Sequence, residues 1–240
     1  MTPFVEATAK AAAAISERLC VGWRDEYTDH FEIGAGGDRT AGIDKMAEEI
    51  YVEALLPFGI IDSEESGIIG SGNDRVILDP IDGSDNALSG LPYFGSSIAL
   101  ERDGRVKEAV IVNLANGDLF YKTDGPLMVG KVGEDSFKPV VARGGSRLGI
   151  LERAYAYPKI AQKLYGKGVK FRSPGAVALS LAYAHYVDFV IFAGPRRSYD
   201  FAAALWMCEG LEILQTEKLL IVSKSRETLE FLQRLALQEG

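Results

Sequence analysis

The chain has 240 residues, of which 47% are hydrophobic and 25% are charged. This composition is typical of a folded globular protein and excludes a disordered or collagen-like chain. The net charge of −8 argues against a large basic surface, so we expect neither nucleic acid nor a membrane as a partner.

The N-terminal segment predicts a helix rather than a targeting signal. Thr2 followed by Pro3 is typical of a helix start, and the helical pattern continues to Val21. Glu6 and Glu17 interrupt the apolar run that a secretory signal requires, and no run in the chain reaches the roughly 18 apolar residues of a membrane-spanning helix. We therefore expect a cytoplasmic protein.

The rest of the first half predicts a loop, a second helix and an antiparallel meander. Residues 23–40 are polar and glycine-rich and predict a loop, whereas apolar residues at helical spacing predict a helix from Ile43 to Ala54 that ends before Pro57. Short apolar runs separated by Asp-Gly and Asn-Gly turns then predict strands that pack on the two helices. These strands are expected at residues 75–78, 97–101, 106–114 and 118–121.

The second half alternates between strand-like and helix-like segments, which predicts an α/β arrangement. Strands are expected at residues 140–142, 169–171, 187–192 and 219–222. Helices are expected at residues 151–164, 174–185, 201–208 and 228–237. We expect two domains, an α+β domain over residues 1–140 and an α/β domain over residues 141–240, packed as one body with a cleft between them.

Histidine and cysteine are too scarce to carry the chemistry of a site. The chain has two histidines, His30 and His185, and two distant cysteines, Cys20 and Cys208, without the spacing of metal ligands. Two separated thiols suit a reducing compartment. Any catalysis by this chain must therefore rest on carboxylates.

Four separate fragments place carboxylates where a strand or loop ends beside the start of a helix. In the fragment DPIDG, Asp79 follows a buried strand, Pro80 stiffens the next step and Asp82 lies at a turn, so both carboxylates can point to one place. Gly83 lets the backbone approach a ligand, and its N–H group and that of Ser84 can face an anion. The candidate acids are Asp38, Glu64, Glu65, Asp79, Asp82 and Asp200.

Carboxylates that converge in a partly desolvated pocket repel one another, so a cation must lie between them. Oxygen ligands without histidine or cysteine favour Mg²⁺ or Mn²⁺ over Zn²⁺, and several carboxylates from distant segments suit a phosphate-ester hydrolase with more than one metal ion. Taken singly, the fragments have structural explanations, since Glu64 and Glu65 can be a solvated surface and Asp200 can be an N-cap. Their joint occurrence favours a site.

Four segments of the chain resemble successive signatures of the inositol monophosphatase family. They are DSEESG, ILDPIDGSDNALSGLPYFGSSIAL, RSPGAVALSLAYAHYVDFVIF and YDFAAALWMCEG. The resemblance extends from about residue 34 to residue 210, and the loop sequence GAGGD-x-T is similar to the archaeal inositol monophosphatase and fructose-1,6-bisphosphatase branch. It implies a layered αβαβα sandwich, with an antiparallel sheet in the N-terminal half and a mixed sheet in the C-terminal half, and a homodimer.

The resemblance also implies a role for each matching residue. The implied metal ligands are Glu64, Asp79, the carbonyl of Ile81, Asp82 and Asp200. The residues implied in catalysis are Asp38 and Ser84, which would together orient and deprotonate the attacking water, and Glu65 beside them. Gly83 and Ser84 would bind the phosphate. The implied cofactor is two or three Mg²⁺ ions, for which Mn²⁺ can substitute.

Substrate contacts are expected from the basic and polar groups nearest the implied cleft. Ser173 and Pro174 are typical of a helix start that can face a substrate oxyanion. Arg172, Arg196 and Arg197 can bind phosphate or sugar hydroxyls through their forked donors. The alternative for Arg196 and Arg197 is pairing with nearby acids. The predicted substrate contacts are Arg172, Ser173 and Arg197.

Three positions depart from the pattern that the resemblance implies. Ser84 stands where the family usually has threonine and keeps the hydroxyl, whereas Asp85 adds an acid where a neutral residue is commoner. Ala193 stands where inositol-selective members carry a glutamate that contacts the ring. This last departure favours a broader sugar-phosphate specificity.

These observations predict a Mg²⁺-dependent phosphomonoesterase that acts on a small phosphate ester through metal-activated water. The expected substrates are inositol monophosphate, fructose 1,6-bisphosphate or both. The alternatives are a nucleotide 3′-phosphatase or NADP phosphatase of the same fold, and a non-catalytic, metal-dependent sugar-phosphate sensor.

Overall fold

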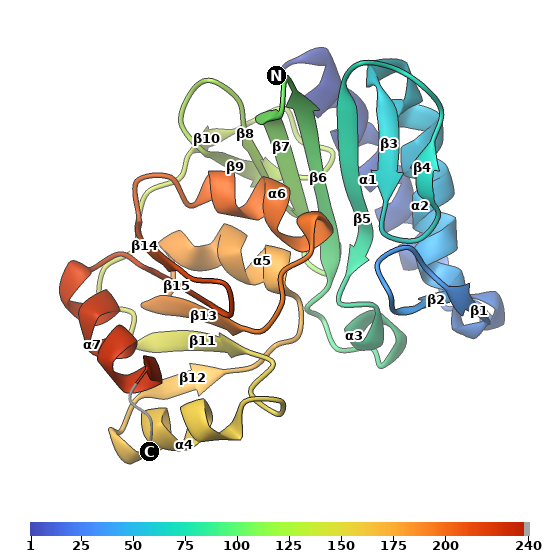
Figure 1. The fold of residues 1–240 in the computed structure, drawn as a ribbon. Coiled ribbons are helices and arrows are strands. Elements are labelled where there is room, and N and C mark those ends of the chain that lie inside the picture. The colour runs from blue at the N-terminus through green and yellow to red at the C-terminus, as the bar shows by residue number, and fades with distance from the viewer. Residues whose placement is uncertain (238–240) are drawn as a thin grey trace.

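The chain is built on two β-sheets with helices between and around them, as Figure 1 shows. The structure is a computed structural model that describes residues 1–237. The larger sheet has eight strands in the order β10-β9-β8-β7-β6-β5-β3-β4, and the smaller has five in the order β12-β11-β13-β15-β14. A separate two-stranded hairpin, β1-β2, lies in the segment that the sequence predicted as a loop.

The first half of the chain supplies the larger sheet. Its strands are β3 (Ile60–Ser63), β4 (Gly67–Ile69), β5 (Arg75–Asp82), β6 (Gly95–Arg102), β7 (Arg105–Asn113), β8 (Asp118–Lys122), β9 (Met128–Lys131) and β10 (Lys138–Pro139). The hairpin strands are β1 (His30–Ile33) and β2 (Arg39–Ala41). The predicted meander from β5 to β8 is antiparallel, whereas β3 pairs with β5 in parallel.

The second half supplies the smaller sheet. Its strands are β11 (Leu148–Glu152), β12 (Lys170–Arg172), β13 (Phe189–Ala193), β14 (Glu212–Gln215) and β15 (Leu219–Ser223). Strands β12, β11 and β13 run parallel to one another, and β15 and β14 continue the sheet antiparallel. This sheet is mixed, as the resemblance implied.

Helices complete five layers. They are α1 (Pro3–Val21), α2 (Gly42–Leu55), α3 (Ser84–Leu88), α4 (Pro158–Gly166), α5 (Val177–Ala182), α6 (Ser198–Met207) and α7 (Arg226–Leu237). Helices α1 and α2 cover the outer face of the larger sheet, α5 and α6 lie between the sheets, and α4 and α7 cover the outer face of the smaller sheet. Three apolar clusters fill the spaces between these layers. The layered αβαβα prediction is confirmed.

The apolar cluster between the sheets draws on both halves of the chain. It contains Ile111 and Phe120 from the larger sheet, Val190 and Val222 from the smaller sheet, and residues of α5 and α6. A division into domains at residue 140 therefore stays a prediction. No helix within residues 1–237 is long and apolar enough to cross a membrane.

The two long N-terminal helices begin where the sequence predicted. Thr2 caps α1, because its hydroxyl oxygen accepts a hydrogen bond from the Val5 N–H at 3.3 Å and Pro3 occupies the first turn. Helix α2 ends at Leu55, just before Pro57.

Three element predictions in the second half are wrong. The strand expected at residues 140–142 does not form, and Val141 is exposed there. Residues 148–152 form strand β11, whereas a helix was expected from residue 151; a short buried apolar run does not distinguish the two. The helix expected from Pro174 begins at Val177, because Gly175 has a φ of +86° that no right-handed helix contains.

Candidate active site

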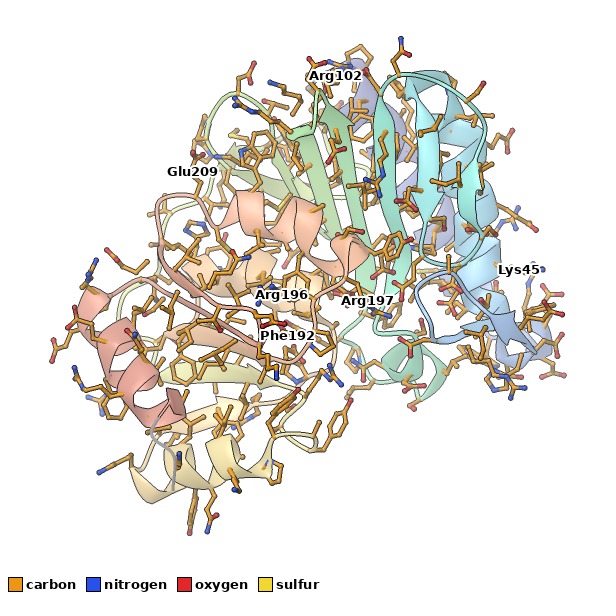
Figure 2. The ribbon with its side chains drawn as sticks, viewed as in Figure 1. Lys45, Arg102, Phe192, Arg196, Arg197 and Glu209 are labelled. Carbon is orange, nitrogen blue, oxygen red and sulfur yellow. The ribbon has the colours of Figure 1, made fainter. Side chains whose placement is uncertain are left out.

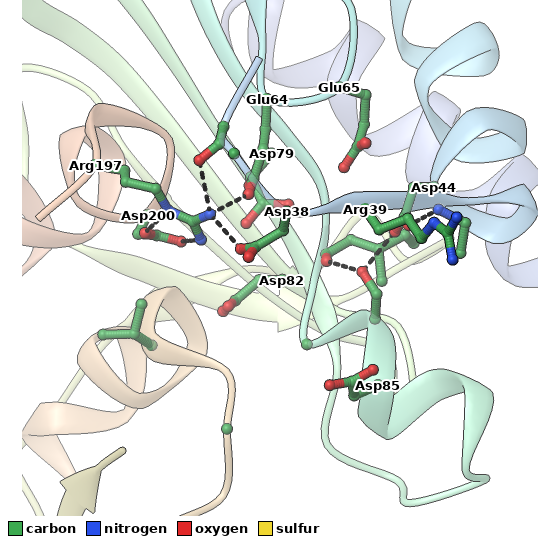
Figure 3. Close-up of a pocket in the computed structure, with 18 of the residues that line it drawn as sticks. Asp38, Arg39, Asp44, Glu64, Glu65, Asp79, Asp82, Asp85, Arg197 and Asp200 are labelled. Carbon is green, nitrogen blue, oxygen red and sulfur yellow. Dashed lines mark hydrogen bonds and ion pairs between the residues drawn. The ribbon is translucent and has the colours of Figure 1, made fainter. Parts of the chain in front are cut away.

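Three buried carboxylates from distant parts of the chain meet at one edge of the larger sheet. Glu64 directly follows β3, Asp79 lies on the parallel neighbour β5, and the carboxyl ends of parallel strands share one edge. Asp200 lies in the first turn of α6, which approaches from the second half. One oxygen from each of the three carboxylates lies within 4.8 Å of the others, and all three residues are buried. Figure 3 shows them side by side.

A β-bulge brings Asp82 to the same cavity. Asp79 pairs with Ser97 and Asp82 pairs with Gly95, so three steps along β5 match two steps along β6. Residues three apart on a regular strand point to opposite faces, and the extra residue restores both to one side. Pro80 lies within the bulge, where a missing N–H group is tolerated. The carboxylate of Asp82 accepts a hydrogen bond from the N–H of Leu179 at 2.9 Å.

The carboxyl groups at this edge hold their protons more tightly than usual. Burial, followed by the negative charges of Glu64 and Asp82, raises the pKa of Asp79 well above its ordinary value. Burial raises the pKa of Glu64 to about 8, although Arg197 opposes the rise. Burial and the charge of Asp200 raise the pKa of Asp82 in the same direction. The arrangement favours positive charge among these oxygens.

The donor set fits a divalent cation. The cluster of Glu64, Asp79 and Asp200 offers carboxylate oxygens alone, and neither Asp79 nor Asp82 has an ion-pair partner within the described residues. Hard cations such as Mg²⁺ and Mn²⁺ prefer oxygen ligands, and a site without histidine or cysteine disfavours Zn²⁺. The carbonyl oxygen of Ile81, a predicted ligand, lies 3.0 Å from Ser84 Oγ.

Arg197 joins three of the acids. Its Nη1 atom lies 2.6 Å from Asp38 Oδ2 and 2.7 Å from Glu64 Oε1, and its Nε atom lies 3.0 Å from Asp200 Oδ2. Figure 3 shows the guanidinium between these carboxylates. Of the two interpretations of Arg197, the structure shows pairing with acids, within the cavity rather than on an outer surface.

The Ser84 hydroxyl contacts Asp44, not Asp38. Ser84 Oγ donates to Asp44 Oδ1 at 2.6 Å, and the N–H of Ala41 donates to Asp44 Oδ2 at 2.8 Å. Burial raises the pKa of Asp44 to about 6. Asp38 instead lies on the exposed turn between β1 and β2 and contacts Arg197. The structure therefore places Asp44 rather than Asp38 in contact with Ser84, and the predicted joint role of Asp38 and Ser84 stays a prediction.

The sequence analysis missed Asp44 as a site residue because its position has a simple local explanation. Asp44 is the third residue of α2, where an acid commonly caps a helix. The contact with Ser84 joins residues 40 positions apart and is decided by how α2 packs beside β5. The available signal was its position six residues after Asp38, another acid that lines the cavity.

Glu65 faces the cavity from the turn that also carries Glu64. Its carboxylate accepts a hydrogen bond from the Thr40 hydroxyl, and burial raises its pKa to about 7. Glu48 of α2 stabilises this turn, because its carboxylate accepts hydrogen bonds from the Ser63 hydroxyl and, at 3.1 Å, from the N–H of Ser66. Glu48 thus braces both sides of the Glu64–Glu65 pair.

Gly83 lies where the two halves of the chain come into contact. Its φ of +90° favours glycine, and a Cβ atom there would lie 3.0 Å from the Cβ of Ala176 and 3.2 Å from the carbonyl oxygen of Gly175. Asn86 in α3 also stabilises the contact between the two halves, because its side-chain amide donates to the carbonyls of Tyr93 and Pro174, each at 2.7 Å. Both Gly83 and Ser84 line the cavity, as predicted for a phosphate site.

These side chains line one cavity of about 600 Å³ between the two halves. Arg197 lines it, whereas Arg172 and Ser173 do not. Arg172 donates to the carbonyl oxygen of Phe171 at 2.9 Å, and the Ser173 hydroxyl accepts from the N–H of Ala154 at 3.1 Å. The helix start that motivated these two residues lies further along the chain, so the structure gives no support to their predicted substrate contacts.

Several cavity residues were not anticipated from the sequence. Besides Asp44, those with polar or aromatic side chains are His30, Arg39, Asp85, Glu152, Arg153, Tyr155 and Phe192. Glu152 is buried and accepts a hydrogen bond from the Gly175 N–H at 3.0 Å. Phe192 lies near the end of β13, and three others lie at or just after the end of β11, namely Glu152, Arg153 and Tyr155. These three were not expected at the cavity because a helix was predicted from residue 151.

Comparison with known proteins agrees with the site. Residues 1–211 match the profile described as the inositol monophosphatase family. The chain belongs to this family. It is 30% identical over 219 residues to the Nus factor SuhB of Escherichia coli K12, an alignment that covers 85% of this chain and 80% of that protein. It is also 30% identical over 161 residues to the fructose-1,6-bisphosphatase of Pyrococcus furiosus, covering 63% of this chain and 58% of that one.

A solved inositol monophosphatase-type fold superposes on nearly the whole chain. The crystal structure of the extragenic suppressor protein suhB from Bartonella henselae has a TM-score of 0.81 and covers 99% of this chain and 100% of its own, at 23% identity. This likeness confirms the fold. As a member of the inositol monophosphatase family, the chain is a metal-dependent phosphoric monoester hydrolase. The homodimer, the cytoplasmic location and the absence of a nucleic-acid partner stay predictions.

Proposed function

We propose that this chain is a Mg²⁺-dependent phosphatase of inositol monophosphate, fructose 1,6-bisphosphate or both. The observation that carries the proposal is the meeting of buried Glu64, Asp79 and Asp200 within 4.8 Å of one another, beside the hydrogen-bonded pair of Ser84 and Asp44. Remote acids that share one cavity have no structural advantage without a cation, because each must be desolvated beside the others.

The proposed metal ligands fall into two overlapping sets. Glu64, Asp79 and the carbonyl of Ile81 would hold one Mg²⁺ ion, and Asp79 with Asp82 and Asp200 would hold a second. Mn²⁺ prefers the same oxygen donors and would substitute. When bound, the ions would lower the pKa of the attacking water and stabilise the charge that develops on the phosphoryl and leaving oxygens.

Ser84 and Asp44 are placed to take the proton of the attacking water. The Ser84 hydroxyl donates its hydrogen to Asp44, which leaves its oxygen free to accept a hydrogen bond from a water in the cavity. A pKa of about 6 lets Asp44 be ionised near neutral pH and still accept a proton readily. As the water oxygen forms its bond to phosphorus, one proton of the water passes through Ser84 to Asp44. The bond from phosphorus to the leaving oxygen breaks, and that oxygen takes a proton from solvent water to leave as the alcohol.

Gly83, Glu65 and Asp38 would support the metal ions and the phosphate. The turn at Gly83, which lines the cavity, would bind the phosphate through its backbone N–H groups. Glu65 would orient Glu64 from the same turn. Asp38, on its exposed turn, would approach a third ion or the substrate once Arg197 no longer contacts it.

The test is phosphate release from inositol 1-phosphate and from fructose 1,6-bisphosphate, each with Mg²⁺ and with EDTA. We expect Mg²⁺-dependent hydrolysis of at least one ester. Hydrolysis of 3′-phosphoadenosine phosphate or NADP alone would support the nucleotide phosphatase instead. Tight binding of the esters without turnover of any of them would support the sugar-phosphate sensor and contradict the proposal.

A further inference from the structure

Arg153 stands apart from the other arginines of the cavity. It directly follows β11, whose last residue Glu152 is in register with Phe192 at the end of the parallel strand β13. Both Arg153 and Phe192 line the cavity, on the wall that the second half of the chain supplies. Figure 2 shows Phe192 and Arg197 where the two halves meet, whereas Lys45 and Arg102 lie at the periphery.

The backbone at Arg153 adopts a conformation that is uncommon for its residue type. Its φ is +57°, and within the described residues the one other non-glycine with positive φ is Asp103, which lies in a hairpin turn. A left-handed conformation is unfavourable for a bulky residue and persists where the surroundings impose it, often at ligand sites. Here it lies at the cavity wall rather than in a hairpin.

The guanidinium of Arg153 is held by aromatic rings. Its Cζ atom lies 6.0 Å from the centre of the Tyr157 ring and 5.9 Å from that of Phe192. A Cβ atom at Gly194 would come within 2.9 Å of its Nη1 atom, so a glycine there makes room for the guanidinium. Gly194 has a φ of +121°, which also favours glycine.

No carboxylate neutralises this arginine. Among the residues that the structure describes, Arg153 has no ion pair, whereas Arg197 has three. Its charge is nevertheless close enough to Asp200 to oppose the rise in the pKa of that carboxyl group. A fixed, uncompensated guanidinium at the wall of a cavity is suited to an anion that arrives with the ligand.

The size of the cavity leaves room for such a ligand. A volume of about 600 Å³ is within the range of sites that hold a whole small molecule. The proposed metal and phosphate groups lie at the end formed by the larger sheet. The wall with Arg153 and the exposed Tyr155 remains for the part of the substrate that leaves.

We propose that Arg153 binds a second phosphate group carried by the leaving alcohol, so that the chain favours polyol bisphosphates over the corresponding monophosphates. This proposal rests on the proposed function and specifies its substrate class. The first phosphate is hydrolysed at the acid cluster, while the second pairs with Arg153 and fixes the orientation of the leaving group.

The experiment compares two esters that differ in the second phosphate alone, fructose 1-phosphate and fructose 1,6-bisphosphate, with Mg²⁺ present. The quantity measured is the ratio of kcat/KM for the bisphosphate to kcat/KM for the monophosphate. We expect a ratio of roughly 10 to 100 in the wild type, the range of one hydrogen-bonded charge pair. In Arg153→Met the ratio falls towards one, because kcat/KM for the bisphosphate falls more than kcat/KM for the monophosphate.

Two further variants make the result specific. Arg153→Lys keeps the positive charge but loses the planar guanidinium, so we expect a ratio of kcat/KM values between those of the wild type and Arg153→Met. This variant replaces Arg153→Met in the comparison if Arg153→Met does not fold. Arg147→Met removes an exposed arginine just before β11 that does not line the cavity, and it leaves the ratio unchanged.

The failures of the two proposals can be told apart. Hydrolysis of fructose 1-phosphate together with a wild-type ratio near one, or an equal loss on both esters in Arg153→Met, overturns the role of Arg153 and leaves the proposed function standing. Absence of Mg²⁺-dependent hydrolysis of any ester by the wild type overturns the proposed function and, with it, the role of Arg153.

Discussion

The two walls of the cavity differ in charge and in how their side chains are held. The wall from the first half consists mainly of carboxylates whose backbones are fixed by strands and helix starts, such as Asp79 in β5 and Asp44 in α2. The wall from the second half combines two acids, Glu152 and Asp200, with two arginines, Arg153 and Arg197. The first wall is therefore suited to cations, whereas the second wall adds Arg153, which has no ion pair among the described residues and is suited to an anion. Hydrolysis requires that both face one space.

The largest expected effect removes one acid from each wall. Asp82→Asn and Asp200→Asn should each lower Mg²⁺-dependent turnover by about 10³-fold or more, because losing a metal ligand removes several kcal/mol of charge stabilisation. Asp124→Asn changes an exposed acid and should have no effect. Wild-type turnover in either cavity variant, with the fold intact by circular dichroism, would contradict the assignment.

The next effect concerns proton transfer at the first wall. Ser84→Ala and Asp44→Asn should each slow turnover by about 10²-fold, the usual contribution of a positioned base. The double variant should be little slower than either single variant, since the two groups act as a pair. Ser89→Ala, an exposed serine just after α3, is the control. Fully additive losses in kcat would argue against the pair.

Asp44 also makes a pH-dependent contribution to stability. Its pKa is raised from 3.8 to about 6, so the folded state binds this proton more tightly than the unfolded state. The resulting stabilisation is fully present below pH 3.8 and is lost as pH rises through about 6. In EDTA, the free energy of unfolding of the wild type relative to Asp44→Asn should fall by about 2 kcal/mol between pH 4 and pH 7.

Urea denaturation of both proteins across this pH range provides the measurement. Comparison with Asp44→Asn cancels the titration of the other acids, as long as these groups are not strongly coupled to Asp44. A constant difference between the two proteins at all pH values would show that Asp44 titrates as it would in an unfolded chain.

The smallest effect tests how the first wall is held. Glu48→Ala should weaken Mn²⁺ binding by roughly 10-fold, because the turn that carries Glu64 loses its hydrogen bonds to α2. Glu48→Gln, which keeps an acceptor oxygen, should recover part of the affinity. Glu49→Ala, an exposed change on the same helix, is the control. Titration calorimetry that finds equal affinity in all three variants would rule out this bracing role.

The first wall was largely predictable from the sequence, and the second was not. Local signals sufficed for α1, α2 and the meander from β5 to β8. The motif residues Asp79 and Asp82 lie on β5, and Glu64 lies in the turn after the neighbouring strand β3. On the second wall, predicting a helix where β11 forms concealed Arg153 at the strand end. A short apolar run is compatible with a strand or a helix. Here the pairing of β11 with β12 and β13 decides that it is a buried strand.

By itself, the sequence determined which carboxylates occur in which local settings, and its motifs were sufficient to indicate the family. Only the tertiary structure decided the partners of these groups: Asp44 rather than Asp38 beside Ser84, and acids rather than open solvent around Arg197. Strands and helix starts follow from interactions between neighbours in the chain. The contacts in the cavity join residues 40 to 160 positions apart, and the packing of whole layers decides them.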